Sequence, residues 1–277
     1  MTTIRRRHNK HRPHSKLAQR KRKLLLLKIG GIVGFLLFIA IGIVFILRID
    51  RINIVDINIK GNSAIATYAL QKFTEDKLSG NYAYVFPKSN ILLYPRKDIQ
   101  KSLSDSFKEI KKVDVSFESL QSISISIEER KPYALYCGDQ VSTSTDCYFL
   151  DEDGLIFTEA PEFSGNVYLK YFGELGLSDP IGQNFMQTDE FRGLNFFLVS
   201  LVKMDLKPII FHIINKDDFE IQLESGGKIL FGKDQNLSDI YENIQSVFNG
   251  DEFDKENLST LDYADFRFGN KVYFKFK

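Results

Sequence analysis

Acidic residues are missing from the first 28 positions of this 277-residue chain, which hold 11 of its 37 Lys and Arg residues. Residues 29–277 therefore carry 26 basic and 36 acidic residues, a net charge of −10. A basic tail followed by an acidic remainder indicates two different environments. The length allows one to two domains, and 43% hydrophobic with 26% charged residues is ordinary for a folded protein.

Charge is also missing from the 19 residues 29–47, IGGIVGFLLFIAIGIVFIL. A helix of that length crosses the roughly 30 Å hydrocarbon core of a bilayer. The run is longer than the ~7–15 apolar residues of a secretory signal, and no small-x-small cleavage site follows it. We therefore predict an uncleaved membrane helix over 24–47. The preceding positive charge places the tail 1–23 in the cytoplasm and 48–277 outside it, as in a single-pass type II membrane protein.

The tail sequence RRRHNKHRPHSK could instead bind nucleic acid or anionic lipid. It lacks the interleaved aromatic residues that stack on bases. Membrane orientation together with lipid contact explains its charge better, so no nucleic-acid partner is expected.

Cysteine and histidine are scarce: the chain has two cysteines and, beyond the tail, one histidine. So few ligands argue against a metal site. Cys137 and Cys147 lie ten positions apart around a polar loop, and two flanking strands would bring them opposite each other. Outside the cytoplasm such a pair is expected to form a disulfide. The histidine, His212, lies in the apolar run PIIFHIIN and is predicted to be structural.

Complete catalytic motifs are lacking as well. Ser225 with Lys228, and Ser200 with Lys203, have the spacing S-x-x-K, but no S-D-N or K-T-G partner accompanies them. The acidic residues 151–153 resemble a calcium loop only superficially, since Gly154 follows them immediately instead of standing at the sixth position of the loop. We predict no catalytic residue, no metal and no cofactor, and therefore no enzyme.

Hydrophobic periodicity predicts an α+β fold with two regions after the membrane helix. The first, 48–130, contains a strand over 51–60, a helix capped by Ser63 and a helix opened by Pro95, followed by two alternating strands. This βααββ order predicts a compact domain with both helices on one face of the sheet. The charged stretch EERKP ends it, because Pro cannot donate to a β-ladder.

The second region, 131–277, predicts mainly antiparallel strands interrupted by two helices, one after Thr188 and one over about 237–248. Three short turns, Asp153-Gly154, Gly226-Gly227 and Gly269-Asn270, favour hairpins. The helices carry apolar stripes that predict core packing rather than binding grooves.

The strand after Gly269-Asn270 alternates cleanly. Val272, Phe274 and Phe276 are predicted to face the core. Lys271, Tyr273 and Lys275 lie on the opposite face, and such a strand is expected to leave one edge open.

Several stretches together resemble the FtsQ/DivIB family of bacterial division proteins over about 24–277. INIKGNSAI, Asn90 and the E-R-x-P signature from Glu129 to Pro132 resemble a POTRA (polypeptide-transport-associated) domain. CYFLDEDGLIF and DFRFGNKVYF resemble the hairpins that open and close the family's β domain. The sequence departs from the family in a 79–89 insertion and in its cysteine pair.

The resemblance implies a non-enzymatic scaffold at the division septum of the plasma membrane. It would bind FtsB/DivIC-like and FtsL-like partners outside the membrane and link them to septal peptidoglycan synthases. The alternative is a membrane-anchored POTRA protein in envelope assembly or protein export.

The resemblance also implies that the partner adds a strand to the edge of the last strand. The matching positions are Arg267 and Phe268 with the strand from Lys271, including Tyr273 and Lys275. The lysines of this strand could instead protect an open edge from unwanted pairing.

Overall fold

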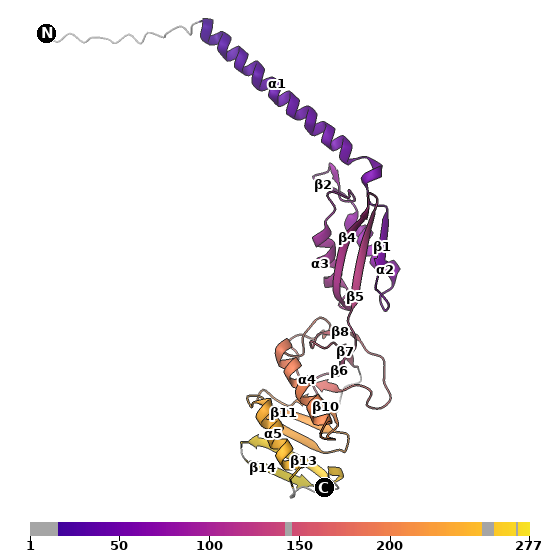
Figure 1. Ribbon diagram of the computed structural model, residues 1–277, viewed down its shortest axis with the longest axis vertical. Helices are drawn as coiled ribbons and strands as arrows, with labels where there is room; N and C mark the ends of the chain where they lie inside the picture. The colour runs from indigo at the N-terminus through magenta and orange to yellow at the C-terminus, as the bar shows by residue number, and fades with distance from the viewer. Residues whose placement is uncertain (1–15, 142–145, 251–257, 270) are drawn as a thin grey trace, which may run out of the picture. The chain divides into compact units, whose positions relative to one another are not determined.

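The computed structural model describes residues 16–141, 146–250, 258–269 and 271–277, which form an α+β fold (Figure 1). The chain divides into two compact units. One comprises the chain up to Asn58 with 71–99 and 115–125, and the other comprises 59–70, 100–114 and 126–277. Because this division interleaves the two predicted regions, the boundary between 130 and 131 stays a prediction.

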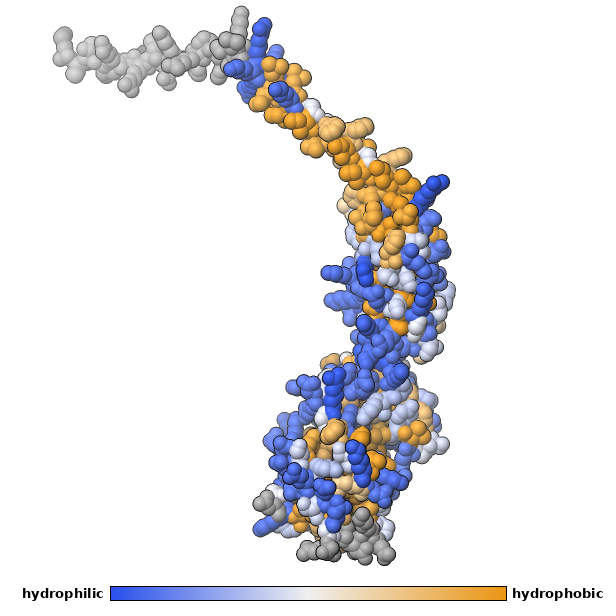
Figure 2. All heavy atoms as spheres, viewed as in Figure 1, coloured by the Kyte–Doolittle hydropathy of each residue, from blue (hydrophilic) through white to orange (hydrophobic). Residues whose placement is uncertain are grey.

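The first helix, α1 (Lys16–Leu47), contains a 28-residue stretch, Arg20–Leu47, that is long and apolar enough to cross a membrane. Its hydrophobic surface is visible in Figure 2. The helix begins earlier than the predicted residue 24, because KLAQRKRK consists largely of strong helix formers. A short 3₁₀ turn (Asp50–Ile52) follows it.

The smaller sheet has the strand order β1-β5-β4. Its strands are β1 (Asp56–Lys60), β4 (Ile110–Ser119) and β5 (Ser122–Glu129), and the helices between β1 and β4 are α2 (Thr67–Leu78) and α3 (Arg96–Ser106). The predicted order of strand, helix, helix, strand and strand is therefore present. The 79–89 insertion adds a short hairpin of β2 (Asn81–Tyr82) and β3 (Phe86–Pro87).

The predicted helix cap at Ser63 is wrong, since α2 begins at Thr67. The carboxylate of Glu129 accepts the backbone N–H groups of residues 63, 64 and 65, at 2.9–3.2 Å, and so holds this turn outside the helix. The preceding Gly61 has φ +87°, and a Cβ there would lie 2.1 Å from the carbonyl oxygen of Ile127. Only glycine fits that approach.

The larger sheet has nine described strands in the order β14-β13-β12-β11-β10-β9-β6-β7-β8. They are β6 (Ala134–Tyr136), β7 (Tyr148–Leu150), β8 (Ile156–Glu159), β9 (Lys170–Phe172), β10 (Pro208–Ile213), β11 (Asp218–Leu223), β12 (Lys228–Gly232), β13 (Leu261–Phe268) and β14 (Lys271–Phe276). Most neighbours are antiparallel, as predicted. Two of the parallel pairs, β9 with β10 and β12 with β13, follow from the crossover helices α4 (Thr188–Val202) and α5 (Leu237–Phe248).

The stripes of both crossover helices contribute to one hydrophobic core, as predicted. On α4, Phe191 and Leu201 are fully buried, and on α5, Ile240 and Ile244 are buried. Aromatic rings fill the centre: Tyr171 lies 5.3 Å from Phe191 between ring centroids. This core supports the end of the sheet that carries β13 and β14.

Candidate functional site: the open edge of β14

The strand β14 lies at one end of the larger sheet and pairs with β13 in antiparallel register. Tyr263 faces Lys275, and Asp265 faces Tyr273. Among the described residues no strand pairs with its other side. Gly269 has φ +65°, as a tight turn requires, whereas Asn270 lies outside the described residues. An extended segment could add to this edge through backbone hydrogen bonds.

The core-facing side of β14 differs in part from the prediction. Val272 and Phe274 pack against the hydrophobic core, and the ring of Phe274 lies 6.3 Å from that of Phe248 on α5. Phe276 stacks on Phe274 but is 44% exposed. It lies opposite Leu261, the first residue of β13, at a corner of the sheet where fewer side chains can cover it. Phe276 therefore lies on the predicted core-facing side of the strand, but the core does not cover it.

The backbone hydrogen bond that follows β14 shows which of its groups point outward. The N–H of Lys277 donates to the carbonyl of Thr260, at 2.8 Å, toward β13. Backbone groups alternate in direction along a strand, so those of 271, 273 and 275 point toward β13 as well. Those of Val272, Phe274 and Phe276 point toward the open edge.

Arg267 is held by two carboxylates rather than projecting into solvent. Its Nε and Nη2 donate to both oxygens of Asp265, at 2.9 and 2.6 Å, and Nη1 lies 3.2 Å from Asp218 on β11. These hydrogen bonds, with Asp265 foremost, raise the pKa of the guanidinium. Burial disfavours the charged form of Asp265, but the bonds from Arg267 outweigh it and hold the pKa of that carboxyl below its ordinary value.

The other predicted site residues form an exposed strip beside Arg267. The ring of Phe268, 57% exposed, meets that of Tyr273, 51% exposed, edge-on at 5.2 Å. Lys275 pairs with Asp262 at 2.9 Å, and the hydrogen bond to that carboxylate raises the pKa of the ammonium. Lys271 is exposed opposite Phe268. The structure thus brings all five predicted positions to one end of the sheet.

Sequence reasoning missed the carboxylates that hold the basic residues of this strip. Asp265 lies two positions before Arg267, a spacing that places both side chains on one face of a strand and could have signalled the pair. Asp218 could not have been found in this way, because it is distant in sequence and reaches Arg267 only through the order of strands in the sheet.

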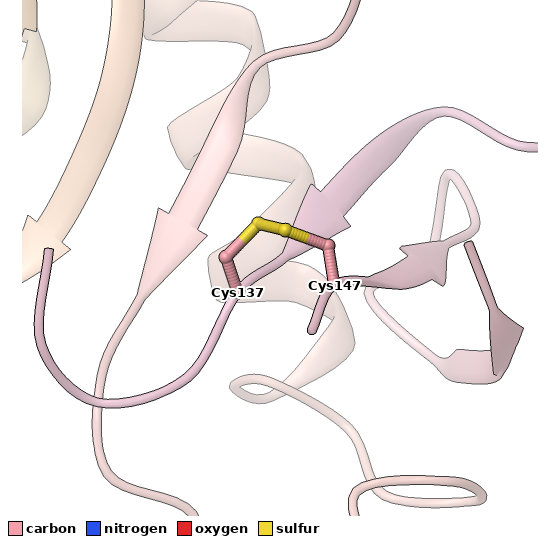
Figure 3. Close-up of a disulfide and its surroundings, with 2 residues drawn as sticks. All are labelled: Cys137 and Cys147. Atoms are coloured by element: carbon pink, nitrogen blue, oxygen red, sulfur yellow. A yellow bond between two sulfur atoms is a disulfide. The ribbon is translucent and has the colours of Figure 1, made fainter. Parts of the chain in front are cut away.

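Cys137 and Cys147 are joined by a disulfide between the segments that follow β6 and precede β7 (Figure 3). Cys137 is buried in a small cluster with Leu135 and Phe172. Residues 142–145 of the loop between them lie outside the described residues. The bond joins neighbouring strands of the sheet, as the sequence predicted for a strand–loop–strand segment.

Three residues of the motifs considered for catalysis or metal binding, His212, Ser200 and Lys228, have structural partners. His212 Nε2 lies 3.3 Å from the carbonyl oxygen of Asp139, and the Ser200 hydroxyl donates to the Phe196 carbonyl within α4. Lys228 pairs with Glu220 at 3.2 Å. Within the described part of the chain, no group of three or more His, Cys, Asp or Glu residues has an arrangement that could hold a metal ion.

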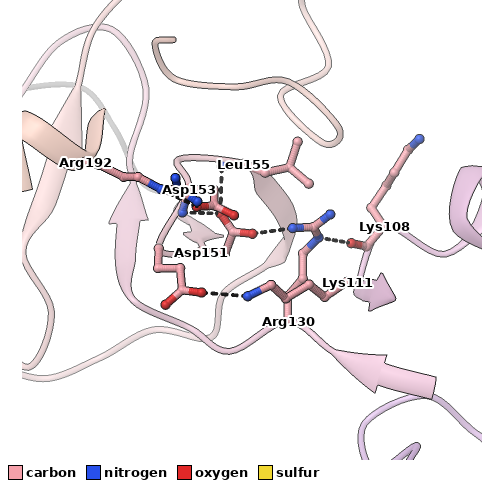
Figure 4. A network of polar contacts seen from close by, with 8 residues as sticks. Lys108, Lys111, Arg130, Asp151, Asp153, Leu155 and Arg192 are labelled. Atoms are coloured by element: carbon pink, nitrogen blue, oxygen red, sulfur yellow. Dashed lines mark hydrogen bonds and ion pairs between the residues drawn. The ribbon is translucent and has the colours of Figure 1, made fainter. Parts of the chain in front are cut away.

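The acidic turn 151–153 takes part in a polar network with basic residues (Figure 4). The buried Asp151 accepts the backbone N–H groups of Asp153 and Leu155, both at 2.9 Å, and also a bond from the guanidinium of Arg130. The oxygens of Asp151 thus accept hydrogen bonds that stabilise the turn. Arg130, the second residue of the E-R-x-P signature, therefore forms an ion pair with the turn of the β7–β8 hairpin.

No known family model matches this chain, and no curated protein matches it.

Proposed function

We propose that this chain is a non-enzymatic, membrane-anchored scaffold of the bacterial division machinery, of the FtsQ/DivIB type. The observation that carries the proposal is the open edge of β14 beside Phe268 and Tyr273. An apolar N-terminal helix, a small unit with the order expected of a POTRA domain and a larger sheet ending in an open strand are the parts that such a scaffold needs.

The partner that best fits this edge is an extended segment of an FtsB/DivIC-like protein, accompanied by an FtsL-like subunit. Its backbone would pair with the outward groups of β14. Its side chains would meet the aromatic strip and the exposed Lys271, which favours acidic residues in the partner. In this arrangement Arg267 keeps Asp218 and Asp265 in place and so orients the turn before β14, rather than attracting the partner by a free charge.

The lysines of β14 also suit the competing interpretation, in which they only prevent sheet-to-sheet aggregation. Two observations favour a binding edge. Lys275 is engaged by Asp262, so part of the protective charge is neutralised. In addition, two large aromatic side chains are exposed next to the edge, whereas protection alone predicts polar ones.

Localisation of a fluorescent fusion in dividing cells tests the proposal. We expect the full chain to concentrate at the septum and to recover an FtsB/DivIC-like subunit in a pull-down. A uniform envelope signal, with defects in outer-layer assembly or export upon depletion, would favour the alternative of a POTRA protein in those processes.

A further inference from the structure

The hairpin of β2 and β3 is bonded to the end of α1. Arg48, the first residue after the helix, donates its Nε–H to the carbonyl of Val85 at 3.2 Å. The side-chain amide of Asn90 donates to the carbonyl of Leu47, the last helical residue, at 2.8 Å. The hairpin and the segment after it are therefore fixed to the point where the apolar helix ends.

Backbone hydrogen bonds also join the segment after α1 to the segment after the hairpin. The N–H of Ile54 donates to the carbonyl of Ser89 at 2.8 Å, and the N–H of Ile91 donates to the carbonyl of Ile52 at 2.9 Å. The two segments 47–54 and 85–91 thus run together as one hydrogen-bonded structure. If the segment 47–54 lies near the membrane, the segment 85–91 must lie near it as well.

Large apolar side chains are exposed on this structure. Tyr84 at the tip of the hairpin is 94% exposed, and Leu92, two positions after Asn90, is 73% exposed. Tyr82 and Leu93 add partly exposed surface beside them. Large apolar residues exposed along one hydrogen-bonded segment indicate a surface that meets another apolar phase.

The backbone of the hairpin tip holds Tyr84 outward. Ala83 and Tyr84 have φ values of +47° and +62°, which residues other than glycine rarely adopt. Such conformations are unfavourable and persist only where the surrounding structure holds them in place. Here they present an aromatic side chain at the end of a tight loop instead of the usual Asn-Gly.

The length of the apolar helix indicates how deep in the bilayer this exposed surface would lie. The 19 uncharged residues 29–47 span about 28 Å at 1.5 Å per residue, which fills the hydrocarbon core of a bilayer. Leu47 then lies at its boundary, and the groups bonded to Leu47 and Arg48 lie in the headgroup layer, which is about 5–8 Å deep. Tyrosine is enriched at that depth in membrane proteins.

The charges around the hairpin suit anionic headgroups. Residues 80–93 contain one basic residue, Lys88, and no acidic residue. The Lys88 ammonium lies 5.8 Å from the ring centre of Tyr82. Arg48 and Arg51 are exposed in the adjoining segment, where Asp50 is the one acidic neighbour between residues 47 and 55.

We infer that the 79–89 insertion is an interfacial membrane contact, in which Tyr84 and Leu92 enter the headgroup layer of an anionic phospholipid bilayer. The inference rests on the proposed insertion of α1. Its effect would be to hold the small unit against the membrane surface, so that the unit does not pivot freely at the end of α1.

The chain contains no tryptophan, so one introduced tryptophan reports on one position. We would reconstitute full-length Tyr84→Trp in vesicles of equimolar phosphatidylcholine and phosphatidylglycerol, brominated either near the glycerol or near the end of the acyl chains. Phe38→Trp, in the middle of α1, reports on the span. Tyr68→Trp replaces a tyrosine of similar exposure (73%) in the other compact unit and serves as the matched control.

We expect Tyr84→Trp to emit at shorter wavelength than Tyr68→Trp, to be quenched most by shallow bromine and to be shielded from aqueous iodide. Phe38→Trp should be quenched by deep bromine, and Tyr68→Trp by iodide alone. Leu92→Trp gives a second reading of the same surface if Tyr84→Trp disturbs the loop.

If Phe38→Trp is quenched by lipid while Tyr84→Trp and Leu92→Trp respond only to iodide, the hairpin does not touch the bilayer and the inference is overturned. If Phe38→Trp also escapes lipid quenching, the insertion of α1 fails first, and the membrane anchor of the proposed function fails with it.

Discussion

Arg130 and Asp151 form an ion pair in which both side chains are largely buried, 17% and 3% exposed. The Nε–H of Arg130 donates to the carbonyl of Lys108 as well, at 3.1 Å, so one guanidinium joins the segment before β4 to the turn between β7 and β8 (Figure 4). Breaking a buried ion pair by removing one partner leaves an unpaired charge, which is strongly destabilising.

We therefore expect Asp151→Asn to lower the free energy of unfolding by about 3 kcal/mol. The amide can still accept the N–H groups of Asp153 and Leu155, so the loss reports on the charge. Asp153→Asn is the matched control in the same turn: its partner Arg192 is 60% exposed, and a change within about 1 kcal/mol is expected. Thermal unfolding of the full chain in detergent, followed by circular dichroism, would contradict this prediction if both variants behaved alike.

Glu129 makes the stability of the turn before α2 depend on pH. Burial disfavours its charged form, but backbone N–H groups of Ala64, Ile65 and Ser63 outweigh burial and lower the pKa of this carboxyl below its ordinary value of 4.5. A lowered folded-state pKa gives stability that is complete above pH 4.5 and is lost as the pH falls through the folded value.

Glu129→Gln should consequently lower the melting temperature at neutral pH, by the equivalent of about 2 kcal/mol, and flatten its decline below pH 4.5. The exposed neighbour allows a control, Glu128→Gln, which should leave both quantities unchanged. Parallel pH profiles for Glu129→Gln and the parent would show that these bonds do not govern the acid response.

The disulfide should stabilise the hairpin of β6 and β7 by no more than about 3 kcal/mol, because it closes a loop of only ten positions. In exported protein we expect Cys137 and Cys147 to resist maleimide labelling until they are reduced. Replacing both by Ala should weaken the hairpin and leave partner binding at β14 intact. Labelling of both thiols in folded, unreduced protein would contradict the bond.

Orientation in the membrane follows from the charge imbalance around α1, with 11 basic and no acidic residues before position 29. Protease added outside intact spheroplasts should digest residues beyond about 50 and spare the tail. Permeabilised spheroplasts, in which the tail becomes accessible, serve as the control. Protection of 48–277 in intact spheroplasts would reverse the topology.

Periodicity and turn residues predicted most elements of this fold, because side-chain alternation along strands and apolar stripes along α4 and α5 are local properties of the sequence. Periodicity and turn residues gave wrong predictions where a residue distant in sequence determines the local structure. Ser63 looks like a helix cap until Glu129, more than sixty positions away, takes its backbone N–H. The candidate site shows the same limit, since nothing local in the sequence indicates that the sheet brings Asp218 beside Arg267.

The direction of the backbone groups in β14 determines which substitution tests the proposed binding edge. Tyr273→Pro is unsuited to this test, because the N–H of Tyr273 points toward β13 and its loss would break the ladder within the sheet. The N–H of Val272 points toward the open edge, a position at which an edge strand tolerates proline. Val272→Pro therefore removes a donor for the partner while the pairing with β13 is retained.

We expect Val272→Pro to keep the circular dichroism of the parent and to lose capture of an FtsB/DivIC-like subunit, whereas Val272→Ala, which keeps the N–H, binds it. Lys271→Glu tests the charge at the same edge and should weaken capture of an acidic segment roughly tenfold, the equivalent of about 1.4 kcal/mol. Arg267 is unsuited to that test, because charge reversal there would place a third carboxylate beside Asp218 and Asp265 and disturb the fold. If folded Val272→Pro and Lys271→Glu both capture the subunit with parental affinity, the partner binds elsewhere and the lysines of β14 serve as protection of the edge.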